Sequence, residues 1–117
     1  MEPKRLKICW DCDDCLLLPS VASGLPYDTP NYEVIAIYHF FQKQGAYMIV
    51  WSGGGVDYAR MVAEKLGLKP DEIREKKKSE DVDIAFDDCI VDLAKVNVRV
   101  KRINNGISRK EWNEHES

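Results

Sequence analysis

The chain has 117 residues, enough for one hydrophobic core, so a single domain over residues 1–117 is expected. Hydrophobic residues make up 44% and charged residues 32% of the sequence, which is typical of a globular protein. No apolar run approaches the length of a membrane span and no apolar signal region is recognisable, so we expect a cytoplasmic protein without a membrane partner. The net charge of −3 argues against a broad nucleic-acid surface but leaves nucleic acid open as a partner.

Apolar runs predict strands that alternate with helical patterns along the chain. The runs LKICW, AYMIVW, VDIAF and VRVKRI predict four strands, at 6–10, 46–51, 82–86 and 98–103. The first three are apolar enough to be buried, whereas the fourth carries charges and is expected to be more exposed. A loop-rich segment follows the first strand and precedes the first helix.

Two main helices are predicted between these strands. The first takes Thr29 as its N-cap and Pro30 as its first residue, and stops at Gly45. The second runs from about 56 to 66 and stops at Gly67.

Shorter helical segments are expected near the C-terminus. A helical turn is predicted after Asp88, and a last helix from Ser108, because Ser108 and Glu111 have the spacing of a capping box. Strands that alternate with helices imply parallel strands joined by right-handed crossovers. The expected fold class is therefore α/β, a three-layer α/β/α sandwich around a mostly parallel sheet.

Polar side chains stand where three of the predicted strands end. Asp11 follows the first strand, Ser52 the second, and Asp87 and Asp88 the third, while Asp13 lies just beyond Asp11. Ligand sites of parallel sheets lie at the carboxyl ends of the strands, so these side chains are expected to meet. Carboxylates gathered there repel one another unless a cation neutralises them, and Mg²⁺ is typically held by carboxylates together with phosphate oxygens. The pattern predicts a magnesium site and a phosphorylated substrate.

The turn after the second strand is suited to an anion. Ser52 and the glycines Gly53, Gly54 and Gly55 lead directly into a predicted helix N-terminus, where unpaired N–H groups attract negative charge. A tight strand-to-helix turn without any ligand would use the same residues. At the first strand, one carboxylate of the Asp11 and Asp13 pair can attack phosphorus while its neighbour exchanges a proton.

With these residues in place, the chain resembles the haloacid dehalogenase-like superfamily of Mg²⁺-dependent phosphohydrolases over nearly its whole length. The family's first motif, Asp-x-Asp-x-Thr after an apolar strand, is matched by DCDDC except at its last position, where Cys15 replaces threonine. The resemblance implies that Asp11 is the nucleophile that forms an aspartyl-phosphate and that Asp13 is the general acid/base.

The remaining motifs assign further roles. The strand that ends in Ser52 matches the second motif, which implies that Ser52 and the glycine turn at Gly53 and Gly54 hold the phosphoryl group. The acidic motif IAFDD completes a Mg²⁺ site. Its implied ligands are three carboxylates and one backbone carbonyl, from Asp11, Asp87, Asp88 and Asp13 respectively.

The motif lysine has three candidates, Lys76, Lys77 and Lys78. Lys78 is the expected one because it is nearest to the acidic motif, with Lys76 and Lys77 as alternatives. At least one of the three is expected to be a solvated surface residue.

Neither of the segments 17–31 and 55–77 has room for a cap domain. The resemblance is therefore to capless, Rossmann-like members, whose open site admits macromolecular substrates or is covered by another subunit of a homo-oligomer. The thiol of Cys15 is a weaker hydrogen-bonding group than a hydroxyl. The alternative function is accordingly a weak or inactive phosphate-binding module.

A third hypothesis is a metal protein that uses its thiols. Cys9, Cys12, Cys15 and Cys89 would have to ligate zinc or an iron–sulfur cluster. Cys9 lies inside a predicted strand, where its side chain should enter the core. We therefore favour the interpretation that these cysteines are small fillers around an acidic site.

Overall fold

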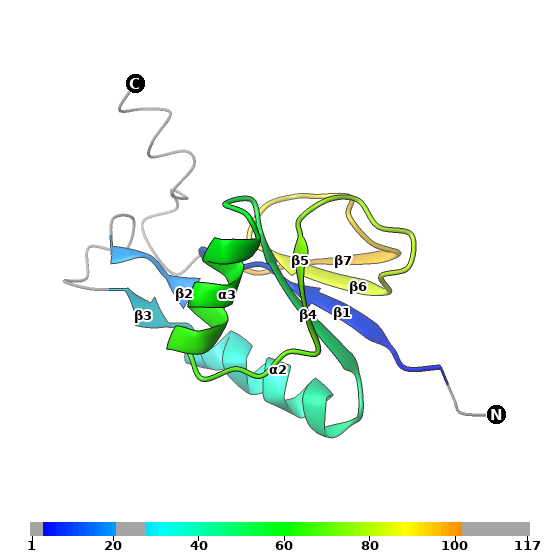
Figure 1. Cartoon of the computed structure of the whole chain (residues 1–117). Coiled ribbons are helices and arrows are strands. Elements are labelled where there is room, and N and C mark those ends of the chain that lie inside the picture. Colours follow the sequence, from blue (N-terminus) through cyan, green and yellow to red (C-terminus); the bar gives the residue numbers. More distant parts are fainter. Residues whose placement is uncertain (1–3, 21–27, 102–117) are drawn as a thin grey trace.

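The computed structural model describes residues 4–20 and 28–101. Within this part of the chain five parallel strands form one sheet in the order β5-β4-β1-β6-β7 (Figure 1). Its strands are β1 (Lys7–Trp10), β4 (Tyr47–Ser52), β5 (Glu72–Glu75), β6 (Ile84–Asp87) and β7 (Val96–Arg99). A separate antiparallel pair consists of β2 (Leu17–Leu18) and β3 (Thr29–Pro30). The predicted α/β class with a parallel sheet is confirmed.

The two main helices are α2 (Tyr32–Lys43) and α3 (Val56–Lys65). The predicted start of α2 is wrong, because Thr29 and Pro30 pair with β2 and Asn31 takes the N-cap position. Both helix ends are followed by glycines with positive φ, +88° at Gly45 and +70° at Gly67, which agrees with the predicted stops.

Side chains alternate along each strand between the two faces of the sheet. On one face, Ile8 and Trp10 of β1 pack against Tyr38 of α2 and Val62 of α3. Both helices therefore lie on the same side of the sheet (Figure 1).

The opposite face is built around Cys9, Ile49 and Trp51, and it packs against Leu93 and Ala94 from the segment between β6 and β7. A loop covers this face where the three-layer prediction expects helices. Among residues 4–20 and 28–101 the predicted second helical layer is therefore not observed.

Aromatic packing fixes the strands that carry the candidate site residues. The rings of Trp10 and Phe86 are stacked, with centroids 4.2 Å apart, and Tyr38 meets Trp10 edge-on at 5.2 Å. Such contacts stabilise by about 1 kcal/mol each beyond the area they bury. Because Trp10 directly precedes Asp11 and Phe86 directly precedes Asp87, this stack holds two acidic strand ends next to each other.

The strands and the segment after β6 also differ from the sequence predictions. Strand β5 was not predicted, since its sequence EIRE is not apolar, and β7 begins two positions earlier than the predicted strand. The helical turn expected after Asp88 is wrong, because residues 88–95 form no helix. The last predicted helix, from Ser108, lies outside the described residues.

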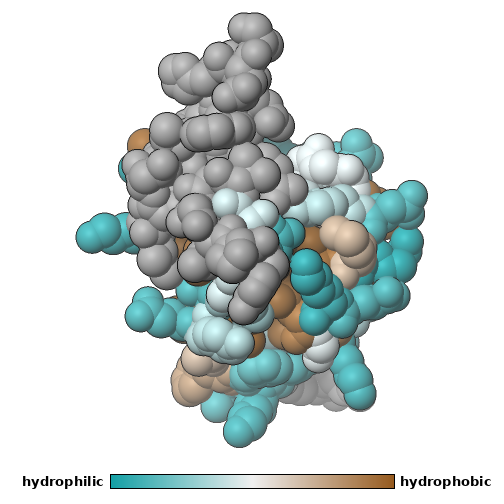
Figure 2. Space-filling model, turned by 90° about the vertical axis from the view of Figure 1, so that its left-hand side faces the viewer, coloured by the Kyte–Doolittle hydropathy of each residue, from teal (hydrophilic) through white to brown (hydrophobic). Residues whose placement is uncertain are grey.

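The described surface is mostly polar. On the face seen in Figure 2, hydrophobic residues form separate patches among hydrophilic ones. None of the helices in the described ranges is long and apolar enough to cross a membrane.

Candidate active site at the carboxyl edge of the sheet

The carboxyl ends of β1, β4 and β6 bring the predicted strand-end residues together. Pairing aligns Trp10 of β1 with Val50 of β4 and with Phe86 of β6, so Asp11, Ser52 and Asp87 follow at the same edge. The backbone N–H of Asp11 donates to the Phe86 carbonyl at 3.1 Å. The residues concerned are all buried, at 6% exposure or less: Asp11, Ser52, Asp87 and Asp88. Carboxylates distant in sequence thus share one buried edge.

Lys76 supplies a positive charge to this edge. Its Nζ lies 2.5 Å from Asp87 Oδ2 and 3.3 Å from Asp11 Oδ1. Burial lowers the pKa of Lys76, but the charges of Asp11 and Asp87 outweigh this and raise it overall. The ammonium is therefore protonated and bridges the two carboxylates.

Lys78, the expected motif lysine, lies elsewhere. Its Nζ pairs with Asp92 at 3.0 Å, and both side chains are exposed, whereas the alternative Lys76 reaches the acidic edge. Lys77 is exposed as well. The physical reason is the position at which β5 ends. Its last residue is Glu75, so Lys76 follows directly at the carboxyl edge of the sheet, whereas Lys78 comes after the chain has left the sheet.

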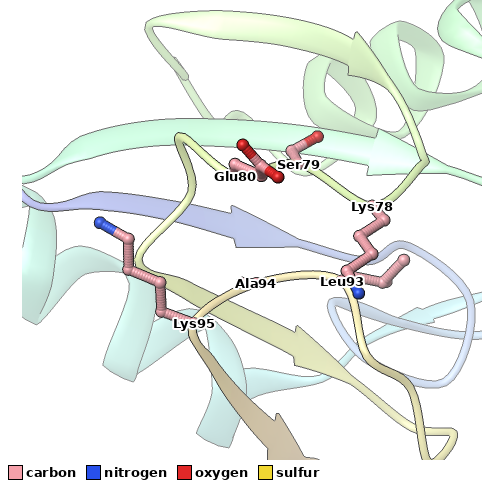
Figure 3. Close-up of a pocket in the computed structure, with 6 residues that line it drawn as sticks. All are labelled: Lys78, Ser79, Glu80, Leu93, Ala94 and Lys95. Atoms are coloured by element: carbon pink, nitrogen blue, oxygen red, sulfur yellow. The ribbon is translucent and has the colours of Figure 1, made fainter.

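Lys78 instead borders a pocket of about 270 Å³ beside the loop-covered face of the sheet (Figure 3). Lys78 and Lys95 lie at opposite ends of this pocket in the view of Figure 3. Its lining is Lys78, Ser79, Glu80, Leu93, Ala94 and Lys95. None of the predicted catalytic carboxylates is part of it.

The electrostatics of the acidic edge favour an added cation. Burial is the main cause that raises the pKa of Asp11, the nearby charge of Asp87 raises it further, and Lys76 opposes both. A divalent cation would relieve this repulsion, and carboxylate oxygens are the donors that Mg²⁺ prefers.

The carboxylates of Asp87 and Asp88 and the thiol of Cys89 form a group that could hold an ion, with one ligand atom from each within 4.8 Å of the others. This group contains neither Asp11 nor Asp13, so only two of the four predicted metal ligands belong to it.

The loop after β1 is held by hydrogen bonds from its thiols. Cys12 Sγ donates to the Trp51 carbonyl at 3.4 Å, and Cys15 Sγ donates to the Phe86 carbonyl at 3.6 Å. Burial raises the pKa of both thiols. They point to different strands, while Cys9 lies on the opposite face of the sheet, so the described structure does not gather the cysteines around one metal.

The glycine turn lies against the helix N-terminus. Ser52 Oγ accepts a hydrogen bond from the N–H of Gly54 at 3.0 Å, and Gly55 precedes α3 with a φ of +101° that favours glycine. A Cβ on Gly54 would lie 3.3 Å from the ring of Tyr58 and 3.4 Å from Ser52 Oγ. Gly53 has open space around it.

Sequence reasoning did not identify Tyr58. Its hydroxyl donates to Asp13 Oδ1 at 2.5 Å, from the first turn of α3. The sequence offered one signal for Tyr58 as a site residue. It stands at the start of the helix that follows the glycine turn, and this turn follows a strand end.

No protein-family model, curated protein or solved structure matches this chain.

Proposed function

We propose that this protein is a phosphohydrolase of the haloacid dehalogenase-like type, which transfers a phosphoryl group first to Asp11 and then to water. The observation that carries the proposal is the meeting of Asp11 and Asp87 with Lys76 at the edge where Ser52 begins a glycine turn. Buried carboxylates that repel one another are a cost to stability, and such arrangements concentrate at functional sites.

In the first half of the reaction, a carboxylate oxygen of Asp11 attacks phosphorus. The bond from phosphorus to the alcohol oxygen breaks, its electron pair stays on that oxygen, and Asp13 gives the oxygen a proton. Lys76, Ser52 and the N–H groups at the start of α3 offset the negative charge of the phosphoryl oxygens. The products of this half are the free alcohol and an aspartyl-phosphate.

In the second half, Asp13 takes a proton from a water molecule as the water oxygen attacks phosphorus. The bond from phosphorus to Asp11 breaks, which restores the Asp11 carboxylate and releases inorganic phosphate. Asp13 regains its proton and both residues are ready for another turnover.

Mg²⁺ is the proposed cofactor. Asp11, Asp87, Asp88 and the backbone carbonyl of Asp13 would hold it, since they present oxygen donors at an edge where carboxylates outnumber the Lys76 ammonium. When bound, the ion would neutralise charge on the phosphoryl oxygens.

The substrate class stays broad. A capless, three-layer Rossmann-like member would have an open site suited to small phosphorylated molecules or to macromolecules, nucleic-acid ends among them, and a second copy of the chain could cover it. We expect such a protein to act in the cytoplasm. The alternative, a phosphate-binding module with little activity, is motivated by Cys15, whose thiol makes only a weak bond to the Phe86 carbonyl.

Hydrolysis of p-nitrophenyl phosphate tests the proposal. Activity should require Mg²⁺, disappear with EDTA, and fall by at least about a hundredfold in D11N, because the nucleophile is lost. Binding of inorganic phosphate without hydrolysis would favour the binding module. Hydrolysis that is equal in D11N and wild type would contradict the enzymatic proposal.

A further inference from the structure

We propose that Tyr58 is a positioning residue for the general acid/base, and that it holds the Asp13 carboxyl group against the leaving group. This inference rests on the proposed function. It adds to that function a residue from α3, an element that the aspartate motifs do not include.

The contact between the two side chains is short. The Tyr58 hydroxyl donates to Asp13 Oδ1 at 2.5 Å, across a large separation in sequence. A hydrogen bond from a neutral donor to a carboxylate is charge-assisted and stronger than one between neutral groups. It therefore restricts the orientation of a carboxylate that stands on a loop rather than on a strand.

The glycine turn constrains the ring of Tyr58. A Cβ on Gly54 would come within 3.3 Å of Tyr58 Cδ2, so the ring lies over the backbone of the turn. Helix α3 directly follows the glycine turn, and Tyr58 lies in the first turn of this helix. The helix therefore holds the Tyr58 ring next to the glycine turn. One side chain thus contacts both the phosphate-binding turn and the acid/base.

The thiol that replaces the family's threonine does not take this role. Cys15 Sγ donates to the Phe86 carbonyl, away from Asp13. The hydroxyl that contacts Asp13 comes from Tyr58. Loss of this hydroxyl should misplace the proton donor without removing it.

Comparing substrates with different leaving groups distinguishes a misplaced proton donor from a general loss of folded structure. An alkoxide needs a proton as it departs, whereas p-nitrophenolate departs without one, so an acid out of place slows alkyl phosphates selectively. The ratio of the two kcat/KM values is independent of the fraction of folded enzyme. It therefore remains informative even if a variant is partly unfolded.

The test compares Y58F with wild type on glycerol 2-phosphate and p-nitrophenyl phosphate, with Mg²⁺ present. We expect kcat/KM to fall about tenfold or more on glycerol 2-phosphate and less than about twofold on p-nitrophenyl phosphate, since misplaced catalytic groups cost up to about a hundredfold. The matched control is Y47F, which removes a hydroxyl that donates to Glu72 at 3.0 Å and should leave both values unchanged.

A double-mutant cycle completes the test. In a D13N background, Y58F should not change the ratio between the two substrates further, because the proton donor is already absent. Equal losses on both substrates, or a selective loss that persists in D13N, would overturn the role of Tyr58 while leaving the phosphohydrolase intact. Wild-type activity that D11N does not abolish would overturn the proposed function, and the role of Tyr58 with it.

Discussion

Lys76 Nζ lies 2.5 Å from Asp87 Oδ2, although their strands are not neighbours in the sheet. Lys76 directly follows β5, and the ends of β4 and β1 separate it from β6, which carries Asp87. Lys76 Nζ also lies 3.3 Å from Oδ1 of Asp11, which follows β1. One side chain thus spans the carboxyl edge of the sheet and compensates two buried carboxylates.

Replacement of Lys76 by methionine should therefore affect both stability and activity. K76M leaves two buried carboxylates without their common partner, and removal of one member of a buried ion pair costs about 3 kcal/mol. We expect a lower midpoint in urea unfolding and loss of p-nitrophenyl phosphate hydrolysis. K78M is the matched control, since Lys78 pairs with Asp92 at the surface, and it should change stability by less than about 0.5 kcal/mol. A K78M variant that loses activity while K76M retains it would favour Lys78, the lysine expected from the sequence, over Lys76.

The strand ends could be predicted from the sequence because buried parallel strands are continuous apolar runs. The runs that end at Trp10 and Phe86 are such strands, and the acidic residues after them meet as predicted. The helix stops at Gly45 and Gly67 could also be predicted from the local sequence. The residue that follows a helix often has a positive φ, which glycine adopts most easily, and both glycines do so here.

The choice of Lys76 over Lys78 as the lysine that reaches the acidic edge could not be predicted, because it depends on β5. The strand EIRE has a single apolar residue, Ile73, among three charged ones and resembles a surface segment, so the sequence predicts one strand fewer than the sheet contains. Without β5, nearness to the acidic motif in sequence favours Lys78 over Lys76. The contact of Tyr58 with Asp13 depends in turn on how α3 packs, which no local pattern specifies.

The D11N substitution should stabilise the metal-free protein. Burial and the charge of Asp87 raise the pKa of Asp11, so ionised Asp11 destabilises the fold at neutral pH. Its removal should increase the free energy of unfolding, and Lys76 keeps Asp87 as its partner in the variant. Thermal unfolding in EDTA at pH 7 measures this. Added Mg²⁺ should stabilise wild type more than D11N, because the ion loses a ligand in the variant. A D11N protein that is less stable than wild type in EDTA would show that the Asp11 charge is satisfied without metal.

Arg74 should make stability dependent on pH. It lies 2.6 Å from Glu72 and 3.0 Å from Asp81, and hydrogen bonds from its guanidinium are the main cause that lowers the pKa of each carboxyl. A lowered pKa contributes stability above the ordinary values near 4, which is lost as the pH falls through the folded-state values. R74M should therefore be about 1 kcal/mol less stable than wild type at pH 7, with a smaller difference at pH 3.

Urea unfolding at the two pH values measures this contribution of Arg74. R60M, which breaks an exposed pair with Asp57, is the control and should match wild type at both. A difference between R74M and wild type that is the same at pH 7 and pH 3 would mean that Arg74 acts through packing alone.

The C15T substitution should raise turnover. Cys15 is fully buried and donates to the Phe86 carbonyl at 3.6 Å. A hydroxyl is a better donor than a thiol, and one such hydrogen bond contributes about 1 kcal/mol, or about fivefold in rate if it fixes the loop that carries Asp13. Steady-state hydrolysis of p-nitrophenyl phosphate measures the gain. Unchanged turnover in C15T would show that the hydroxyl is dispensable here.

Thiol reactivity separates the packed cysteines from metal ligands. Cys9, Cys12 and Cys15 are buried and burial raises the pKa of each, so they should resist a thiol reagent in the folded protein. Cys89 is half-buried, and it should react first. Titration with a chromogenic disulfide should give one fast equivalent in native protein and four in denaturant, since the chain has four cysteines. Thiolates bound to a metal react slowly until the metal is withdrawn. The metal hypothesis would instead be supported by a stoichiometric iron or zinc content and by slow reaction of all four thiols that becomes fast once a chelator is added.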